Sequence, residues 1–537
     1  MLTMVLNATL MAILFLFGVG TTPMFTATIL GIAGIILLAI AIKKKQFQKY
    51  EFRWIDLVAA VLIVGIALFM GLSLFSPQFY PGYNNADPAV HFYMAQDALS
   101  NGGHSGMFFY EVNNALIMNG LSLFTDSAFL NYKLYLIIEI FMLTLGGLMF
   151  YALVSSWAKT KPRSIICAII AILYMLGYSL NNMIYGFGHL GAAVTLICFI
   201  AILCKVFWDK IISLKTFIPL MSMSALCITL CYMLFAPVIW IIVAMVIFGY
   251  CRREKYKFKK TALIEFGVFV IPTILAIKFC YFDFILSENL DAANQIRANG
   301  AHYSEYIKNV IIFLPPAFYA FYQNIKKKKS FVTTFLSVSW LVFFAIAVVA
   351  RESGLISPYY CSKIYHVSWL VTFIMVADGA MQLMDKIPKI TTSYFTVIVT
   401  MVSSAFLFQR APLMDLYKFN FRWVRTHETI GEQIMDGYRF ATNEIVDKGE
   451  KITWITTLAH YDRAYWFYGI QIVEANKCSY CQPWQYDTLG LKDEMKKSGV
   501  KYIGIYKLDS ASYEPYIELI EGKKPVFEND EITIYEN

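Results

Sequence analysis

Long apolar stretches separated by short polar segments make up roughly the first three quarters of the chain. We expect a membrane-spanning helix at each stretch, because about 20 apolar residues in a helix cross a hydrocarbon core of roughly 30 Å. The thirteen expected spans are 3–20, 24–42, 54–76, 134–156, 164–180, 190–208, 216–234, 237–250, 261–282, 310–325, 330–350, 367–384 and 392–408. The pattern therefore predicts a polytopic α-helical membrane protein.

The composition agrees with this prediction. Hydrophobic residues make up 58% of the 537 residues and charged residues 15%, whereas soluble globular proteins have about 45–50% apolar and about 25% charged residues. The net charge of +8 does not indicate nucleic-acid binding, because the basic residues lie in short loops between the expected spans. We expect membrane lipid around the chain and no nucleic acid as a partner.

The basic residues also indicate an orientation. A basic run at 43–53 precedes the third span, whereas the segment 77–132 after that span contains no Lys or Arg. The positive-inside rule therefore places the basic run and the N-terminus in the cytoplasm and segment 77–132 outside. The same rule makes 283–308 and 351–366 outer loops. The expected location is the cell (plasma) membrane, with several crossings.

The segment 409–537 differs in kind from the preceding module, 1–408. Amphipathic stretches alternate in it with short strand-like runs at 451–456, 501–506 and 531–535. Such alternation predicts a small α/β domain, and roughly 130 residues suffice to bury a core. Because this segment follows the thirteenth expected span, we place the domain on the extracytoplasmic side.

Asp87 and His91 are the first candidates for chemistry, in the first outer loop. Asp87 followed by Pro88 is a helix-start signal, so an amphipathic helix is expected to begin there. His91 then lies one turn from Asp87 on the same face. Asp87 is either a general base that takes a proton from an acceptor hydroxyl or an ordinary helix cap. Asp97 and Glu111 are the other acidic candidates in this loop.

Lys363 is one of the few basic residues on the expected outer side, and Tyr359 and Tyr360 precede it closely. An ammonium at the outer membrane surface between tyrosines suits a lipid-linked phosphate or diphosphate. The alternative is an interfacial lysine whose ammonium extends to water. Arg351 is expected to assist in phosphate binding or to pair with Glu352.

The outer loop 283–308 carries charges of both signs. It is either a loop that covers the substrate, in which case Arg297 belongs to the binding site, or a solvated connector. Within the spans, Glu139 and Asp378 stand out, because charges are costly in lipid and call for a partner or a polar cavity.

Motifs for other chemistries are absent from the sequence. There is no phosphate-binding loop, H-E-x-x-H or Rossmann motif, so a nucleotide-sugar enzyme acting at the cytoplasmic face is not expected. Cys478 and Cys481 form a C-x-x-C without a second pair, which leaves a local disulfide or two free thiols open. No metal ligands and no certain cofactor are assigned, and a divalent metal ion stays open.

With many spans, an acid-bearing first outer loop, an outer Tyr-Tyr-x-x-Lys element and a C-terminal α/β domain, the chain resembles the GT-C glycosyltransferases. More narrowly, it is similar to bacterial membrane proteins that glycosylate cell-envelope polymers from polyprenyl-phosphate sugars. The resemblance implies that Asp87 is the catalytic base and that Lys363 holds the donor phosphate. His91, Tyr359, Tyr360, Arg351 and Arg297 would then contact substrate.

The function expected from this resemblance is transfer of a hexosyl or pentosyl group, with inversion, from a polyprenyl-phosphate-sugar donor to a cell-envelope glycan acceptor. One alternative is a polysaccharide polymerase or ligase that uses diphosphate-linked glycans. Another is a transporter or flippase of lipid-linked glycans, and a third is an envelope scaffold without catalytic activity. The sugar, the acceptor polymer and the oligomeric state are not encoded in any motif.

Overall fold

The computed structural model describes most of the chain. The described residues are 1–19, 23–43, 53–83, 87–101, 108–122, 128–158, 160–286, 297, 300, 306–327, 330–386, 415–426, 430–456, 461–471, 488–507 and 513–537. The expected span 392–408, the expected domain boundary at 408–409 and the pair Cys478 and Cys481 lie outside these residues.

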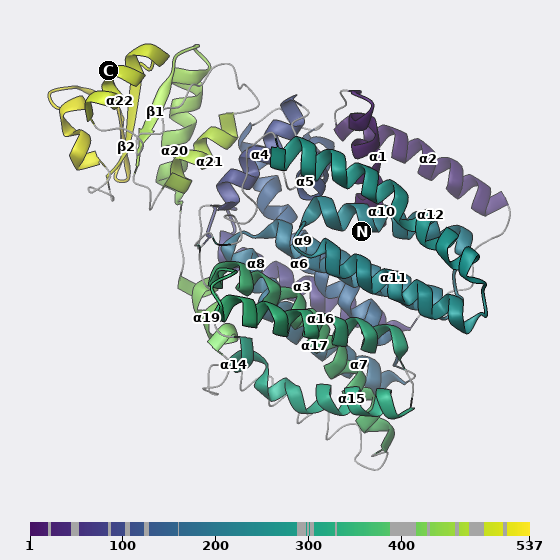
Figure 1. Cartoon of the computed structure of the whole chain (residues 1–537). Coiled ribbons are helices and arrows are strands. Elements are labelled where there is room, and N and C mark those ends of the chain that lie inside the picture. The colour runs from purple at the N-terminus through teal and green to yellow at the C-terminus, as the bar shows by residue number, and fades with distance from the viewer. Residues whose placement is uncertain are drawn as a thin grey trace.

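A bundle of long helices forms the larger part of the molecule (Figure 1). Its helices are α1 (Leu2–Leu16), α2 (Pro23–Lys43), α3 (Trp54–Phe75), α6 (Ala128–Ser155), α7 (Lys161–Tyr174), α8 (Leu180–Tyr185), α9 (Gly188–Trp208), α10 (Leu214–Cys231), α11 (Ala236–Arg253), α12 (Phe258–Ala276), α14 (Tyr306–Val310), α15 (Leu314–Lys327), α16 (Phe331–Glu352) and α17 (Pro358–Lys386). In the described part of the chain, nine helices are long and apolar enough to cross a membrane. The chain is a multi-pass membrane protein.

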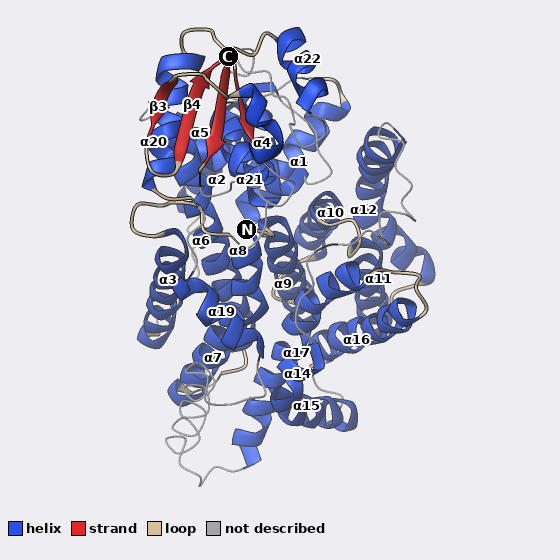
Figure 2. Ribbon diagram, turned by 90° about the vertical axis from the view of Figure 1, so that its left-hand side faces the viewer, coloured by secondary structure: helices blue, strands red, loops and turns tan. Residues whose placement is uncertain are grey.

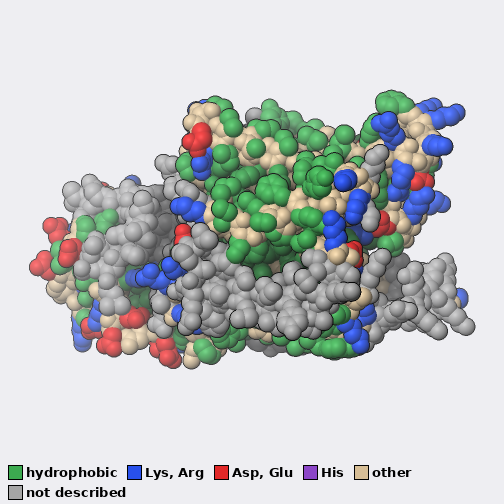
Figure 3. All heavy atoms as spheres, turned by 90° about the horizontal axis from the view of Figure 1, so that it is seen from below, with side chains coloured by type: hydrophobic (Ala, Val, Ile, Leu, Met, Phe, Trp, Pro, Cys, Tyr) green, Lys and Arg blue, Asp and Glu red, His purple; other side chains and the backbone are tan. Residues whose placement is uncertain are grey.

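The surface of the bundle fits this assignment. Large apolar side chains such as Leu62, Phe69 and Ile346 are exposed on its outside, as suits lipid contact. Lys and Arg side chains gather at the end away from the C-terminal sheet, for example around the turn between α11 and α12 (Figure 3).

The expected span 310–325 is divided between α14, a 3-10 turn at Ile311–Phe313 and α15. The helix α15 presents amide side chains to the bundle interior. Asn324 donates to Asp378 at 2.6 Å, and Gln382 donates to the same carboxylate at 3.1 Å. Asp378 thus has the polar partners that a carboxylate inside a membrane requires.

The helix that contains α7 and α8 is interrupted by a π-helical segment, η1 (Met175–Ser179). Trp369 packs directly against Gly177, where a side chain would collide with the indole ring. Asn420 donates to the carbonyl oxygens of Leu176 and Gly177 at 2.9 and 2.8 Å, which satisfies backbone groups in the interruption. Asn420 belongs to α19 (Asp415–Thr426), so this helix packs on the bundle.

Two helices fold from the first expected outer loop, α4 (Asp87–Asn101) and α5 (Phe108–Ser122). The expected amphipathic helix corresponds to α4, whereas α5 was not expected. The N-terminal helices α1 and α2 pack on α5, where Asn7 donates to Asn113 at 3.2 Å and accepts from Thr26 at 2.7 Å. These contacts fix α5 beside the bundle.

A four-stranded sheet forms the core of the C-terminal domain, in the order β1-β2-β4-β3. The strands are β1 (Ile452–Ile455), β2 (Tyr502–Tyr506), β3 (Pro525–Glu528) and β4 (Ile532–Glu536). The pair β1 and β2 is parallel, and the other two pairs are antiparallel. Three of the strands match the expected runs, and β3 is an addition at the edge.

Helices cover both faces of the sheet (Figure 1). The helix α22 (Thr488–Ser498) packs with Ile455 and Ile503, whereas α20 (Glu432–Phe440), which continues into η4 (Ala441–Val446), packs with Trp454 and Ile534 on the other face. The α/β character expected for this segment is confirmed. A further helix, α21 (Tyr461–Gln471), lies where the domain meets α4 and α6 at one end of the bundle (Figure 2).

Candidate functional site

The site lies where the start of α4 meets α9 and α17. Asp87 is the first residue of α4, and the buried Pro88 after it packs against Gly186. Gly186 ends α8 in the left-handed conformation with φ of 68°, and a side chain there would collide with the Pro88 ring. This close approach holds the start of α4, and with it the Asp87 carboxylate, against the turn between α8 and α9.

His91 lies one turn along α4 and is buried, with 4% of its surface exposed. Its ring centre is 4.6 Å from that of His189, at the start of α9. His189 in turn stacks on Tyr232 at 5.6 Å. Within the described residues, neither ring nitrogen of His91 has a hydrogen-bond partner. The buried His91 imidazole thus lies one turn from Asp87, with the buried His189 imidazole beside it.

Lys363 reaches the same place from the first turns of α17. It is buried, with 2% of its surface exposed, and its Nζ lies 3.2 Å from the centre of the Phe187 ring and 4.5 Å from that of Tyr359. Asp87 acts electrostatically on Lys363 without forming an ion pair with it. The ammonium is therefore held by aromatic faces.

Burial sets the charge state of His91. Loss of solvation lowers the pKa of its imidazole to about 4, while the Asp87 charge opposes this shift and the Lys363 charge adds to it. His91 is consequently neutral near pH 7 and can donate and accept a hydrogen bond at the same time.

The tyrosines before Lys363 are half-buried at the margin of this cluster. The Asp87 charge acts on Tyr360 and on Tyr232. Of the residues predicted to form the site, the structure thus brings together Asp87, His91, Tyr359, Tyr360 and Lys363.

The two arginines that were predicted to contact substrate, Arg351 and Arg297, do not join this cluster. Arg351 pairs with the adjacent Glu352 at 2.5 Å and donates to the Tyr365 hydroxyl at 3.2 Å. The pairing with Glu352 that the sequence left open is therefore present. Arg297 is exposed, and most of its loop lies outside the described residues. The structure does not bring either arginine into contact with Lys363.

Sequence patterns did not single out Phe187, His189 or Tyr232, whereas His366 ends the stretch from Ser357 that contains Lys363. His366 lies on α17 with its ring centre 5.0 Å from that of Tyr178. A signal for His189 existed, because the order of the thirteen expected spans places the loop 181–189 on the same side of the membrane as Asp87. Glu111, an alternative acidic candidate, is buried in α5, and the Asp97 side chain lies outside the described part.

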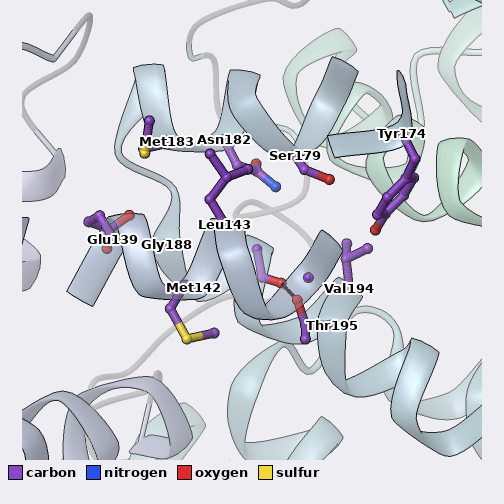
Figure 4. A pocket seen from close by; sticks show the side chains of 12 residues that line it. Glu139, Met142, Leu143, Tyr174, Ser179, Asn182, Met183, Gly188, Val194 and Thr195 are labelled. Carbon is purple, nitrogen blue, oxygen red and sulfur yellow. Dashed lines mark hydrogen bonds between the residues drawn. The ribbon is translucent and has the colours of Figure 1, made fainter. Parts of the chain in front are cut away.

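A small pocket with both polar and apolar side chains in its lining lies in the bundle, beside Gly188, the residue before His189 (Figure 4). It has a volume of about 30 Å³ and lies between α6, α9 and the segment 174–183. Glu139 contributes its carboxyl group and accepts a short hydrogen bond from Tyr110, and the Tyr135 hydroxyl lies 3.1 Å from that of Tyr110. The pocket has room for water. Glu139 thus has a hydrogen-bond partner and space for a water molecule beside it, as expected of a carboxyl group in a span.

The cluster offers one half-buried carboxylate, two imidazoles and one ammonium. A carboxylate can accept a proton from a hydroxyl group, and an ammonium in a dry site can bind a phosphate. In the part of the chain that the structure describes, no group of three His, Cys, Asp or Glu side chains is arranged to hold a metal ion.

No protein-family model and no curated protein matches the chain. Among solved structures, it is similar to the archaeal oligosaccharyltransferase AglB from Archaeoglobus fulgidus in complex with an inhibitory peptide and a dolichol-phosphate. The identity is 12% and the TM-score 0.49, over 84% of this chain and 70% of that one.

The chain is also similar to ArnT from Cupriavidus metallidurans. The apo structure has a TM-score of 0.47 at 12% identity, over 88% of this chain and 97% of that one. The structure bound to undecaprenyl phosphate has a TM-score of 0.44 at 11% identity, with the same coverage. Such distant similarity matches no individual residues, so their roles rest on contacts within this chain.

Proposed function

We propose that the protein is an inverting glycosyltransferase of the cell membrane that takes a sugar from a polyprenyl-phosphate-linked donor. The acceptor is a glycan or polymer of the cell envelope, reached on the extracytoplasmic side. The main support is the meeting of Asp87 and Lys363, which come from distant parts of the sequence and interact across a shared cluster without pairing.

Asp87 acts in this proposal as the general base. The acceptor oxygen forms a bond to the anomeric carbon of the sugar while the bond from that carbon to the phosphate oxygen breaks. The acceptor proton passes to the Asp87 carboxylate, and polyprenyl phosphate leaves with the electron pair. Because phosphate is already a good leaving group, most of the acceleration comes from positioning and from charge near the phosphate.

Lys363 binds the donor phosphate. The aromatic faces that hold its ammonium contribute about 0.5–2 kcal/mol, whereas a hydrogen bond between charged groups contributes about 1.5–3 kcal/mol. A phosphate can therefore displace the ring contacts with Phe187 or Tyr359. The neutral His91, with Tyr359 and Tyr360, lies where it can donate hydrogen bonds to the sugar.

An apolar cavity of about 410 Å³ between α14, α15, α16 and α17 suits the isoprenoid chain of the donor. Tyr306 lines it, and the Tyr306 ring lies 5.5 Å from that of Tyr365, two residues beyond Lys363. A lipid chain in this cavity would keep its phosphate end near the start of α17.

A transfer assay on the purified full-length protein in lipid vesicles tests this function. The vesicles contain a radiolabelled polyprenyl-phosphate sugar, and envelope glycan is added as acceptor. We expect label in the glycan and free polyprenyl phosphate as the second product. Movement of intact donor across the bilayer without a new glycosidic bond would instead identify a flippase. Consumption of only diphosphate-linked glycans would identify a polymerase or ligase.

A further inference from the structure

The C-terminal domain touches the bundle through α21, which lies along α4 (Figures 1 and 2). Trp466 is the central contact and is buried, with 3% of its surface exposed. Its indole ring stacks on Tyr83 at 6.0 Å and on Phe92 at 5.4 Å, and it meets the Tyr135 ring edge-on at 6.1 Å. The rings of Tyr83, Phe92 and Tyr135, all outside the C-terminal domain, thus surround the Trp466 side chain.

Gly469 permits the two helices to approach closely. A methyl group at this position would come within 2.5 Å of the Phe92 ring and within 3.5 Å of the Tyr93 backbone nitrogen. The contact of 2.5 Å with the Phe92 ring is shorter than real side chains allow, so any larger residue at position 469 would force α21 and α4 to shift apart.

The chain before Asp87 is held by the same domain. The backbone N–H of Ile430 donates to the carbonyl oxygen of Pro81 at 3.3 Å. Arg439 interacts with the Tyr80 side chain, and its guanidinium lies 5.9 Å from the centre of the Phe129 ring. Contacts from the C-terminal domain therefore hold residues 80–83 on one side of Asp87 and Phe92 on the other.

We infer that the C-terminal domain positions the Asp87 carboxylate through α21, with Trp466 as the principal positioning residue. This rests on the function proposed above, because it makes Asp87 the base. An isolated helix of 15 residues is marginal in water, so the position of α4 depends on its packing. A shift of about 1 Å at a reacting group lowers a rate by roughly 100-fold, so loss of this packing reaches the chemical step.

Hydrogen–deuterium exchange on the full-length protein in lipid nanodiscs tests whether Trp466 stabilises α4, and it does not require an activity assay. In Trp466→Ala we expect backbone amides of α4 to exchange roughly tenfold faster or more than in the wild type, because α4 opens more often. Trp466→Phe should restore most of the protection. The control is Phe440→Ala, which removes a ring contact with Phe527 at 4.8 Å inside the domain. Unchanged α4 exchange in Trp466→Ala would overturn the inference, even if the protein transfers no sugar.

The transfer assay tests whether the packing of α21 on α4 affects sugar transfer, and the added methyl group of Gly469→Ala is the smallest change that disturbs this packing. Gly469→Ala should lower kcat by about 10- to 100-fold and change the donor KM much less, because the added methyl group displaces α4, with Asp87 and His91, and leaves the phosphate contact of Lys363 in place. Gly120→Ala is the matched control, since Gly120 lies in the outer helix α5 with open space around it. Wild-type kcat in both Gly469→Ala and Trp466→Ala, in an active protein, would refute the positioning role. Absence of transfer in the wild type would refute the proposed function and leave the exchange result standing.

Discussion

The Nζ atom of Lys363 lies 3.2 Å from the centre of the Phe187 ring, at the turn between α8 and α9. Among the described residues, no acidic side chain forms an ion pair with this buried ammonium. Because an isolated buried charge is costly, the aromatic faces and the nearby Asp87 carboxylate stabilise this cation, which makes no hydrogen bond with any other residue that the structure describes. Such a cation is prepared to receive an anion.

Asp87→Asn should abolish sugar transfer while the protein still folds and inserts into the membrane. The amide can still begin the helix, but it cannot accept the acceptor proton, and loss of a general base lowers rates by about 100- to 10,000-fold. The transfer assay and the thermal unfolding midpoint of the purified variant measure the two effects. Near-wild-type transfer would exclude Asp87 as the base and direct attention to Asp97 and Glu111.

Lys363→Ala should weaken use of the donor far more than use of the acceptor. Loss of a charge-assisted contact to phosphate costs about 1.5–3 kcal/mol, which is roughly 10- to 150-fold in the donor's kcat/KM. Lys363→Arg should recover part of this loss, because a planar guanidinium replaces a compact ammonium only partly. The control is Lys386→Ala, an exposed lysine at the other end of α17. If donor kinetics do not change in Lys363→Ala, the phosphate assignment is wrong.

Acid should destabilise the protein partly through His91. Its folded-state pKa of about 4 lies below the usual 6.5, so the unfolded chain binds more protons at intermediate pH. The stability from this group is full above about 6.5 and falls as the pH drops towards about 4. His91→Gln should therefore show a smaller loss of unfolding midpoint between neutral and mildly acidic buffer. An equal loss in wild type and variant would contradict the burial of a neutral imidazole.

Gly188→Ala should destabilise the protein, because the added methyl group would meet the Glu139 carboxyl and the Tyr110 hydroxyl. Overpacking of this kind costs about 1–3 kcal/mol. Gly191→Ala is a matched control on the same helix, since its methyl group would meet only Asn182 at an ordinary 3.8 Å. Thermal unfolding of both variants separates the two sites, and equal midpoints would argue against the close contact at Gly188.

The orientation of the chain in the membrane can be tested with a protease. A protease added outside intact cells or spheroplasts should digest the C-terminal domain, whereas a tag placed before residue 1 should be protected, because the basic loops hold the other side in the cytoplasm. Immunoblots against both ends read the outcome. Protection of both ends would be incompatible with thirteen spans, and Asp87 and Lys363 would lose their expected place on the outer face.

The sequence by itself determined the features that depend on neighbouring residues. Apolar stretches of sufficient length predict the membrane helices, the Asp87-Pro88 pair predicts the start of α4, and alternation predicts β1, β2 and β4. Each of these signals is local, because helix caps, spans and strands are decided by the chemistry of residues a few positions apart.

The tertiary structure decided what depends on contacts between distant segments. It placed His189 against His91, set the Phe187 ring over Lys363 and inserted Trp466 among rings of the bundle. None of these partners is near its counterpart in sequence, so no local pattern contains the information. The helix α21 shows the difference clearly: its apolar positions are evident in the sequence, but the surface that buries them belongs to α4.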